Sequence, residues 1–168
     1  TVILFCFLIG ILVGHPLERE DKPLILGAIT MYMVGLIDDI YDLRPYLKLA
    51  GQIVAALIVT FYGITIDFIS LPIGPTIHFG IFSIPITVIW IVAITNAINL
   101  IDGLDGLASG VSALALMTIG FIAILQANIF IIMICCVLLG SLLGFLFYNF
   151  HPAKIFLGDS GALMIGFI

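Results

Sequence analysis

The sequence predicts an all-α fold, a polytopic transmembrane helical bundle, and three features indicate it. The 168 residues are 63% hydrophobic and only 9% charged, whereas soluble domains are roughly half apolar and a quarter charged. The mean hydropathy is +1.38. Long apolar runs are separated by short polar joints, and they lack the alternation of a membrane β-strand. The net charge of -5 argues against nucleic acid as a partner.

Seven helices, or parts of helices, are expected along the chain. A polar loop at residues 15–23 lies between two prolines, and Pro45 disfavours helical geometry at Arg44, so the second helix should end there. Pro72 and Gly74 stand among β-branched residues, which predicts a small extracytoplasmic hairpin. The expected helices cover residues 1–14, 24–42, 46–66, 84–101, 108–126, 129–148 and a last one from about 162.

Both ends of the chain lie within apolar runs. We therefore expect a single integral membrane domain over residues 1–168, truncated at both ends. Counting crossings puts the joints after the second, fourth and sixth helices on one side of the membrane. These joints carry six of the ten acidic residues: Asp38, Asp39, Asp42, Asp102, Asp105 and Asp159.

Basic residues suggest which side this is. Arg44, Lys48 and Lys154 share the acidic face, whereas Arg19 and Lys22 lie on the other side beside acidic neighbours. The positive-inside rule then favours a cytoplasmic acidic face.

The six carboxylates of these joints predict that a cation binds among them. Asp38 and Asp42 are four residues apart on one helix face, and clustered carboxylates repel one another unless a cation compensates them. Oxygen ligands without His or Cys favour Mg²⁺, with Mn²⁺ as the second choice. The alternative is an ordinary acidic loop that faces water.

The joint after the fourth helix is a polar island. Asn96, Asn99 and Asp102 recur every three residues and so share one helix face. Gly103 and Gly106 permit turns and the close approach of a ligand. This stretch suggests a site for a metal or a phosphorylated ligand.

The last joint offers a possible anion site. Residues 158–161, Gly-Asp-Ser-Gly, resemble a helix N-terminus with free N–H groups, although they also fit a plain helix start. His151 could bind phosphate or lie at the interface. Asn149 could donate to a ligand or cap its own helix.

Three motifs together resemble the polyprenyl-phosphate N-acetylhexosamine-1-phosphate transferases of glycosyltransferase family 4. The motifs are residues 35–42, residues 96–108, and Asn149 with residues 156–161. The resemblance implies a phosphotransferase, with one catalytic membrane domain, that moves a sugar 1-phosphate from a UDP-sugar to a polyprenyl phosphate. It also implies release of UMP and a need for Mg²⁺.

The resemblance also assigns roles residue by residue. It implies that Asp38, Asp39 and Asp159 are catalytic and hold the metal. The remaining positions bind substrate: Gly103, Leu104 and Asp105 line the uridine pocket, Asn149 lies on the nucleotide side, and Asn96, Asn99 and Asp102 complete the signature. A phosphate monoester has a second pKa near 6, so we expect the Asp38–Asp39 pair to place metal and phosphate rather than to remove a proton.

Asp42 and the amino-acid sequence of residues 96–102 suggest which branch of this family the chain resembles. Both resemble the UDP-N-acetylglucosamine branch, which begins teichoic acid or lipopolysaccharide O-antigen synthesis on undecaprenyl phosphate in the bacterial plasma membrane. A homodimer is compatible with this. The family's His-rich motif and N-terminal Gly-Gly segment are missing, so we expect this segment alone to be inactive.

Two alternatives remain at this stage. One is a phospho-N-acetylmuramoyl-pentapeptide transferase of the same family. The other, from a different class, is a cation- or proton-coupled transporter, whose carboxylates should lie near the bilayer midplane.

Overall fold

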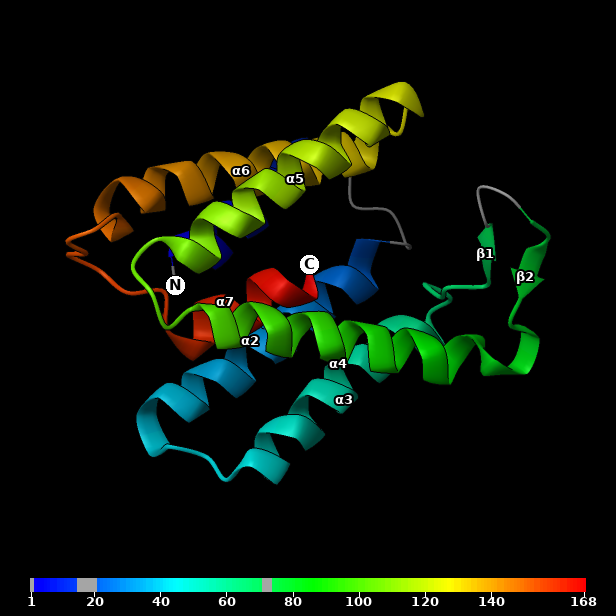
Figure 1. Cartoon of the computed structure of the whole chain (residues 1–168), viewed down its shortest axis with the longest axis horizontal. Helices are drawn as coiled ribbons and strands as arrows, with labels where there is room; N and C mark the ends of the chain where they lie inside the picture. The colour runs from blue at the N-terminus through cyan, green and yellow to red at the C-terminus, as the bar shows by residue number, and fades with distance from the viewer. Residues whose placement is uncertain (1, 15–20, 71–73) are drawn as a thin grey trace.

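The computed structural model of the protein describes residues 2–14, 21–70 and 74–168. In these residues, seven α-helices and one hairpin form a bundle, which confirms the predicted all-α membrane fold (Figure 1). The elements are α1 (Val2–Gly14), α2 (Asp21–Tyr41), α3 (Pro45–Phe61), β1 (Phe68–Ser70), β2 (Thr76–His78), the 3-10 helix η1 (Gly80–Phe82), α4 (Ser83–Ile101), α5 (Leu107–Leu125), α6 (Ile129–Asn149) and α7 (Gly158–Phe167).

Length and apolar composition suit the helices to a bilayer. In the described part of the chain, four helices (α2, α4, α5 and α6) are long and apolar enough to cross a membrane, and α1 and α3 are shorter apolar helices. A helix satisfies its backbone hydrogen bonds internally, which an apolar environment demands.

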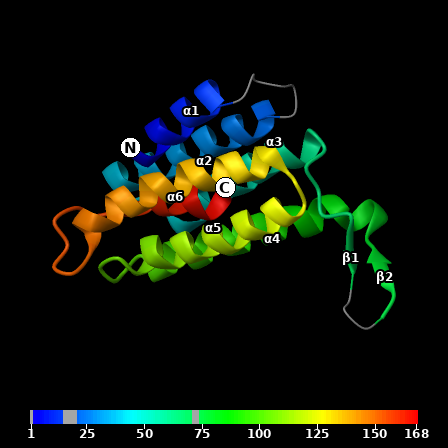
Figure 2. The same cartoon turned by 90° about the horizontal axis from the view of Figure 1, so that it is seen from above.

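Helix α7 lies at the centre of the bundle, packed between α2 and α4 (Figure 2). Helix α3 packs on α2 and α4, while α6 packs on α5 and α1. Leu163 and Met164 of α7 are fully buried. A Cβ on Gly35 would lie 2.5 Å from the backbone oxygen of Asp159, so glycine permits the close approach of α2 to the start of α7.

Three helix ends differ from the sequence expectation, and the start of α7 is described below with its cap. Helix α3 ends at Phe61 rather than near residue 66, because Gly63 adopts a φ of +98° that interrupts the helix. Helix α2 begins at Asp21, because Pro23 lies in the first turn, where its missing N–H is not needed. The end of the predicted polar loop is therefore helical, and its residues 15–20 lie outside the described residues.

The predicted hairpin is present. Strands β1 and β2 pair antiparallel with Phe68 opposite His78, and their rings are 5.7 Å apart. The hairpin projects from one end of the bundle (Figure 1). Pro72, part of the signal that predicted it, lies outside the described residues.

The opposite end of the bundle collects the acidic joints. The last turns of α2, α4 and α6 and the first turn of α7 all lie there, on the left in Figure 1. We call it the acidic end, comprising residues 38–48, 96–106 and 149–160. The predicted convergence of the three joints on one face is confirmed by the side-chain contacts described below.

Candidate functional site

Side chains from four helices meet at the acidic end. Lys48 of α3 lies at their centre, with its Nζ 2.8 Å from Asp38 Oδ2 and 3.1 Å from Asp159 Oδ2. The same Nζ donates to Asn99 Oδ1 at 3.0 Å, and Asn99 Nδ2 donates to Asp159 Oδ1. These four residues and Asp39 form what we call the helix cluster. It brings together all three predicted catalytic residues and adds Lys48.

Asp38 also fixes the turn between α2 and α3. It is 8% exposed, and its Oδ1 accepts a hydrogen bond from the Leu43 N–H at 2.8 Å. Asp42, in the turn itself, has a φ of +52°, a left-handed backbone that Asp tolerates better than most residues. Asp38 therefore holds the turn with one oxygen and presents the other to Lys48.

Asp39 caps the N-terminus of α7. Its Oδ1 accepts from the Asp159 N–H at 2.8 Å, and its Oδ2 accepts from the Ser160 N–H at 3.0 Å. The preceding amide, of Gly158, stabilises the ionised form of Asp102 and so lowers its pKa, against the larger opposing effects described below. A carboxylate of the protein itself therefore accepts from the first amides of α7, which favours the plain helix start of the two interpretations that the sequence left open. With this cap α7 begins at Gly158, not near residue 162.

Asp102 is under electrostatic stress. Burial, and then the charges of Asp159 and Asp39, raise the pKa of Asp102 to about 6. Because this value exceeds the ordinary one, ionised Asp102 destabilises the folded protein above about pH 6, and the effect fades as the pH falls toward 4. A cation bound among these carboxylates would relieve it.

A polar seam joins α3 to α4 beside the cluster. Asn96 Nδ2 donates to Gln52 Oε1 at 2.6 Å and to the Val92 carbonyl at 2.8 Å, while Gln52 Nε2 donates to Asn96 Oδ1 at 3.2 Å. Asn96 and Asn99 therefore share a helix face, as predicted, but the Asn96 amide is used between helices. Sequence reasoning allowed Lys48 to neutralise phosphates but favoured interfacial anchoring, and it gave Gln52 no role. Two polar residues four apart in an apolar helix are nevertheless a usable signal.

The other predicted residues gather in the loops that follow α4 and α6. Asp105 Oδ2 lies 2.9 Å from His151 Nδ1 and accepts from the Ala153 N–H at 3.1 Å. The Ala153 N–H, and after it His151, hold the pKa of Asp105 below its usual range. We call Asp105, Asn149, His151 and Phe156 the loop cluster.

Asn149 ties the two loops together. It is 3% exposed, and its Oδ1 accepts from the Gly106 N–H and the Ser109 hydroxyl, both at 3.1 Å. Its Nδ2 donates to the Ile155 carbonyl at 2.9 Å. The side chain thus holds the loops and has little left to donate to a ligand. Sequence reasoning offered ligand binding or capping and did not anticipate this link.

Two cavities and a groove accompany the clusters. A cavity of about 330 Å³ adjoins the helix cluster and is lined by Asp38, Asp42, Leu43, Pro45, Lys48, Leu49, Asn96, Asn99 and Asp159. An apolar groove of about 340 Å³ between α3 and α4 shares Leu49 and Asn96 with it. A small cavity of about 50 Å³ is lined by Asp102, Gly103, Leu104, Asp105, Asn149, Phe156 and Leu157.

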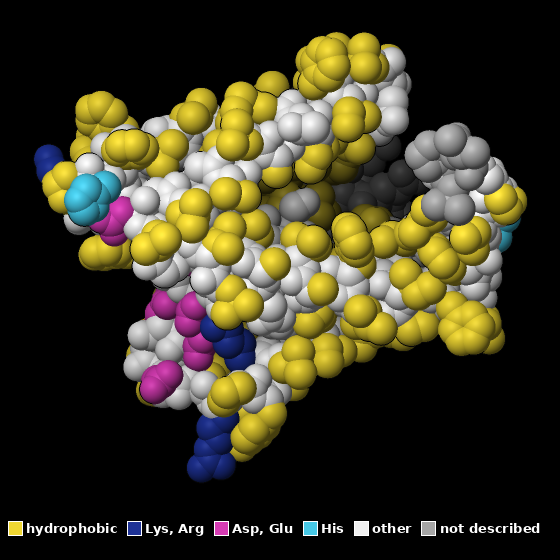
Figure 3. Space-filling model, viewed as in Figure 1, with side chains coloured by type: hydrophobic (Ala, Val, Ile, Leu, Met, Phe, Trp, Pro, Cys, Tyr) yellow, Lys and Arg dark blue, Asp and Glu magenta, His cyan; other side chains and the backbone are white. Residues whose placement is uncertain are grey.

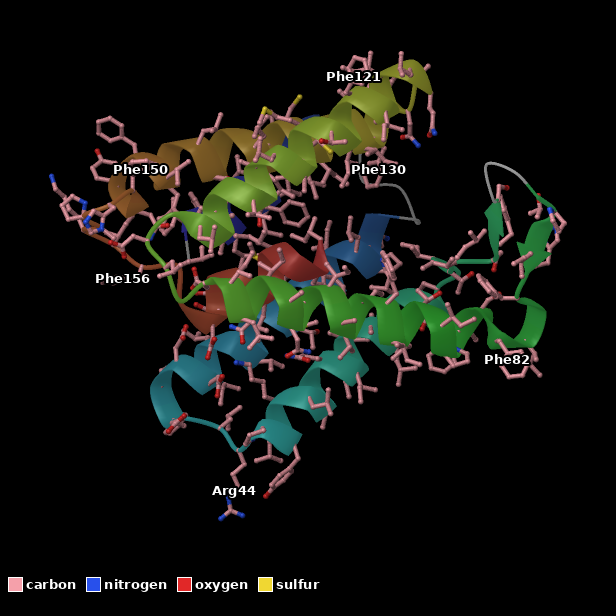
Figure 4. The ribbon with its side chains drawn as sticks, in the orientation of Figure 1. Arg44, Phe82, Phe121, Phe130, Phe150 and Phe156 are labelled. Carbon is pink, nitrogen blue, oxygen red and sulfur yellow. The ribbon has the colours of Figure 1, made fainter. Side chains whose placement is uncertain are left out.

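The surface shows both clusters. In Figure 3 the acidic side chains gather in two places, one beside a histidine and one beside basic side chains near the α2–α3 turn. Phe156 is 76% exposed and lies on the outer side of the α6–α7 loop, while Arg44 extends away from the bundle (Figure 4). Phe156 is a further candidate residue, since it offers an open aromatic face beside Gly103 and Asp105.

The helix cluster offers oxygen ligands that a divalent metal could use. Among the described residues, no three His, Cys, Asp or Glu side chains stand together in a metal-binding arrangement. The donor chemistry nevertheless fits, because Asp38, Asn99 and Asp159 direct oxygens at one cation, the Lys48 ammonium. Carboxylate and amide oxygens of this kind suit Mg²⁺ or Mn²⁺.

The family model described as glycosyl transferase family 4 matches residues 23–168. A probable undecaprenyl-phosphate N-acetylglucosaminyl 1-phosphate transferase of Bacillus subtilis (strain 168) is 45% identical over 151 residues, which are 89% of this chain and 42% of that protein.

Other relatives are named for a different sugar substrate. The phospho-N-acetylmuramoyl-pentapeptide-transferase of Enterococcus hirae is 36% identical over 181 residues, which cover 95% of this chain and 54% of that protein. The one from Streptococcus thermophilus (strain ATCC BAA-250 / LMG 18311) is 36% identical over 163 residues, 91% of this chain and 48% of that protein. The chain spans about half the length of these relatives. With nearly its whole length matched by the family model, the chain belongs to glycosyl transferase family 4.

Proposed function

We propose that this protein transfers N-acetylglucosamine 1-phosphate from UDP-N-acetylglucosamine to undecaprenyl phosphate and releases UMP. It would act in the bacterial plasma membrane with its acidic end in the cytoplasm. The observation that carries the proposal is the helix cluster, in which Asp38, Asn99 and Asp159 surround one cationic group at the end of membrane-length helices. Phosphoryl transfer needs such a place to neutralise charge.

The neighbouring groove supports a lipid acceptor. The 330 Å³ cavity and the apolar groove between α3 and α4 share Leu49 and Asn96, so the two spaces adjoin. A polyprenyl phosphate would lay its tail along the groove and bring its phosphate to Lys48. Carboxylates at one end of the helices, rather than at their middle, also fit an enzyme better than a transporter.

The loop cluster supports a nucleotide. We propose that uridine lies at the small cavity beside Gly103, Leu104 and Asp105, with its ring against the exposed face of Phe156. The pyrophosphate would then extend toward Asp102 and the helix cluster. Asn149 would act indirectly by holding the two loops that form this cavity.

Metal chemistry would supply the charge neutralisation. Asp38 and Asp159, with Asn99, would hold Mg²⁺ or Mn²⁺, which when bound would offset the charge of the pyrophosphate and of the departing UMP. Asp39 would act on the site through its cap on α7, because this cap sets where Asp159 lies.

The reacting groups need little proton transfer. An oxygen of the acceptor phosphate attacks the phosphorus bonded to the sugar, and the bond to the UMP oxygen breaks. With a second pKa near 6, the acceptor phosphate is already mostly ionised at pH 7. The contribution of the protein is therefore positioning and electrostatics, and we assign Asp38 to these rather than to general base catalysis.

The choice of sugar rests on similarity. The relative named for N-acetylglucosamine is 45% identical to this chain, and the relatives named for N-acetylmuramoyl-pentapeptide that are described above are 36% identical. We therefore propose N-acetylglucosamine, with the muramoyl-pentapeptide reaction as the alternative within the family.

The test is a transfer assay with the full-length protein in detergent. It contains Mg²⁺, undecaprenyl phosphate and either labelled UDP-N-acetylglucosamine or labelled UDP-N-acetylmuramoyl-pentapeptide. We expect labelled lipid and UMP with the first donor only. Product with the second donor alone would move the protein to the other branch. No labelled lipid with either donor, together with metal-dependent ion flux in vesicles, would favour a transporter.

A further inference from the structure

The three donors of the Lys48 ammonium are all used inside the helix cluster. Its Nζ contacts Asp38 Oδ2, Asp159 Oδ2 and Asn99 Oδ1 at 2.8, 3.1 and 3.0 Å. An ammonium has three N–H groups, so these contacts saturate it. The side chain is only 17% exposed, so solvent competes weakly for these contacts.

The other oxygens of the cluster have partners elsewhere. Asp38 Oδ1 accepts from the Leu43 N–H, and both Asp39 oxygens accept from amides of α7. Asp159 Oδ1 accepts from Asn99 Nδ2. The carboxylate oxygens of Asp38 and Asp159 that remain are the two on Lys48. The ammonium carries the positive charge between these two oxygens, so a divalent cation that bridges the two residues through them competes with it.

We propose that Lys48 is a tethered competitor of the divalent cation. Its ammonium and the divalent cation compete for the same oxygens of Asp38 and Asp159, and when the cation binds, the ammonium leaves these oxygens and enters the adjoining cavity. This inference rests on the proposed function, since it assumes the cation proposed there. It adds that one side chain of this chain sets how tightly the cation binds.

The surroundings of Lys48 permit this exchange. A lysine ammonium sits on a flexible four-carbon stem, and Lys48 already lines the 330 Å³ cavity. The released charge stays beside the cluster, in the cavity where the proposed phosphates lie. Cation binding and phosphate recognition are thereby coupled, because the same event fills the carboxylate site and frees a positive charge.

The first test follows Lys48 in the unmodified full-length protein. A small amine-acylating reagent is applied with and without Mn²⁺, without sugar nucleotide or lipid, and the modified lysines are quantified by mass spectrometry. We expect Lys48 to be protected without metal and to react at least about fivefold faster with it, since it loses its ion pairs. Lys154 is the internal reference, with an unchanged rate. An unchanged or slower rate at Lys48 would overturn the proposal.

The second test measures Mn²⁺ affinity by electron paramagnetic resonance. Lys48→Gln should bind Mn²⁺ about tenfold more tightly than the wild type, a difference of ~1.4 kcal/mol. Lys154→Gln removes the same charge from the same end of the protein and should change the affinity by less than about twofold, because separated exposed charges are screened. Weaker or unchanged binding by Lys48→Gln would overturn the proposal, and so would no Mn²⁺ binding by either protein.

The two proposals fail separately. Neither test contains a reacting substrate, so labelled lipid in the transfer assay with no effect at Lys48 would remove only this inference. Metal-dependent exposure of Lys48 without labelled lipid would remove only the proposed reaction. If Lys48→Gln does not fold, the acylation of the unmodified protein decides.

Discussion

The helix cluster and the loop cluster share one end of the bundle, yet they hold their side chains by different means. In the helix cluster, Asp38 and Asp159 face each other across Lys48, on helices that pack directly. In the loop cluster, Asp105 and Asn149 bind mainly backbone groups of two connecting loops. The first arrangement concentrates charge, whereas the second ties its polar side chains mainly to the backbone of the loops.

This difference indicates two separate roles, one for each cluster. Concentrated carboxylates on packed helices suit a cation and phosphates, whose energy depends on charge and on a fixed geometry. Loops that are tied by their own backbone and expose Phe156 suit recognition of an uncharged ring. Changes in the helix cluster should therefore affect turnover, and changes in the loop cluster should affect nucleotide binding.

The largest effect is expected at Asp159. Asp159→Asn removes a charge that faces Lys48 and a proposed metal ligand, so turnover should fall about 10³-fold in the labelled-lipid assay. The control is Asp67→Asn at the other end of the bundle, where Asp67 accepts from Thr65, and its turnover should be unchanged. Retention of more than about a tenth of the activity by Asp159→Asn would remove the proposed division of work.

Asp38→Asn distinguishes positioning from proton removal. The amide keeps an oxygen for the Leu43 N–H but loses the charge, so we expect activity about 10²-fold lower at every pH from about 6 to 9. The measurement is kcat as a function of pH, beside the wild type. Full recovery at high pH would restore a general-base role for Asp38.

Asp39→Asn tests the cap on α7. Replacing one acceptor oxygen by an NH₂ group breaks one of two bonds to α7 amides, which should lower the free energy of unfolding by about 1–2 kcal/mol. Thermal unfolding in detergent measures it. The matched control is Asp42→Asn, since Asn also tolerates the φ of +52° there. Equal shifts for both variants would contradict the cap.

Asp105→Asn should separate the loop cluster from turnover. We expect KM for the UDP-sugar to rise about tenfold while kcat changes by less than about threefold. The pKa of Asp105 is lowered, so its carboxylate is ionised and makes these contacts at any pH above the ordinary pKa of Asp. The contacts are lost as the pH falls through the lowered pKa. UMP binding by variant and wild type should thus differ at about pH 7 and converge only below about pH 4. A loss confined to kcat would contradict this assignment.

The smallest effect is expected at Asp102, which lies between the clusters. Asp102→Asn removes a charge whose pKa is raised to about 6, so it should stabilise the metal-free protein above that pH. We expect the melting temperature to rise by about 1–3 °C at about pH 8, with no change near pH 4. If added Mg²⁺ abolishes the gain, Asp102 acts with the helix cluster. If it does not, Asp102 belongs with the loops.

The helices and their convergence could be predicted because they depend on local composition. Apolar runs broken by polar joints give the helices, and alternating crossings bring Asp38, Asp102 and Asp159 to one end. The start of α7 could not be predicted in this way. Its cap comes from Asp39, 120 residues before Asp159, and no local signal at Gly158 reveals this partner.

The acidic residues of the candidate site could be predicted from the sequence, but the residues that bind them could not. A lysine near the membrane boundary looks like an interfacial anchor, so the central position of Lys48 is visible only once α3 lies against α2, α4 and α7. Asn149 is similar, because its bonds to Gly106 and Ile155 depend on how two loops meet. The sequence shows which hydrogen bonds a side chain can make, but it does not show which neighbouring residues already make them.

The cap on α7 also bears on how the protein is made. Synthesis proceeds from the N-terminus, so α2, which carries Asp39, is complete before the ribosome reaches α7. The amides of Asp159 and Ser160 thus find their acceptor already built. The cap therefore joins a residue that is synthesised early, Asp39, to a helix that is synthesised late, α7.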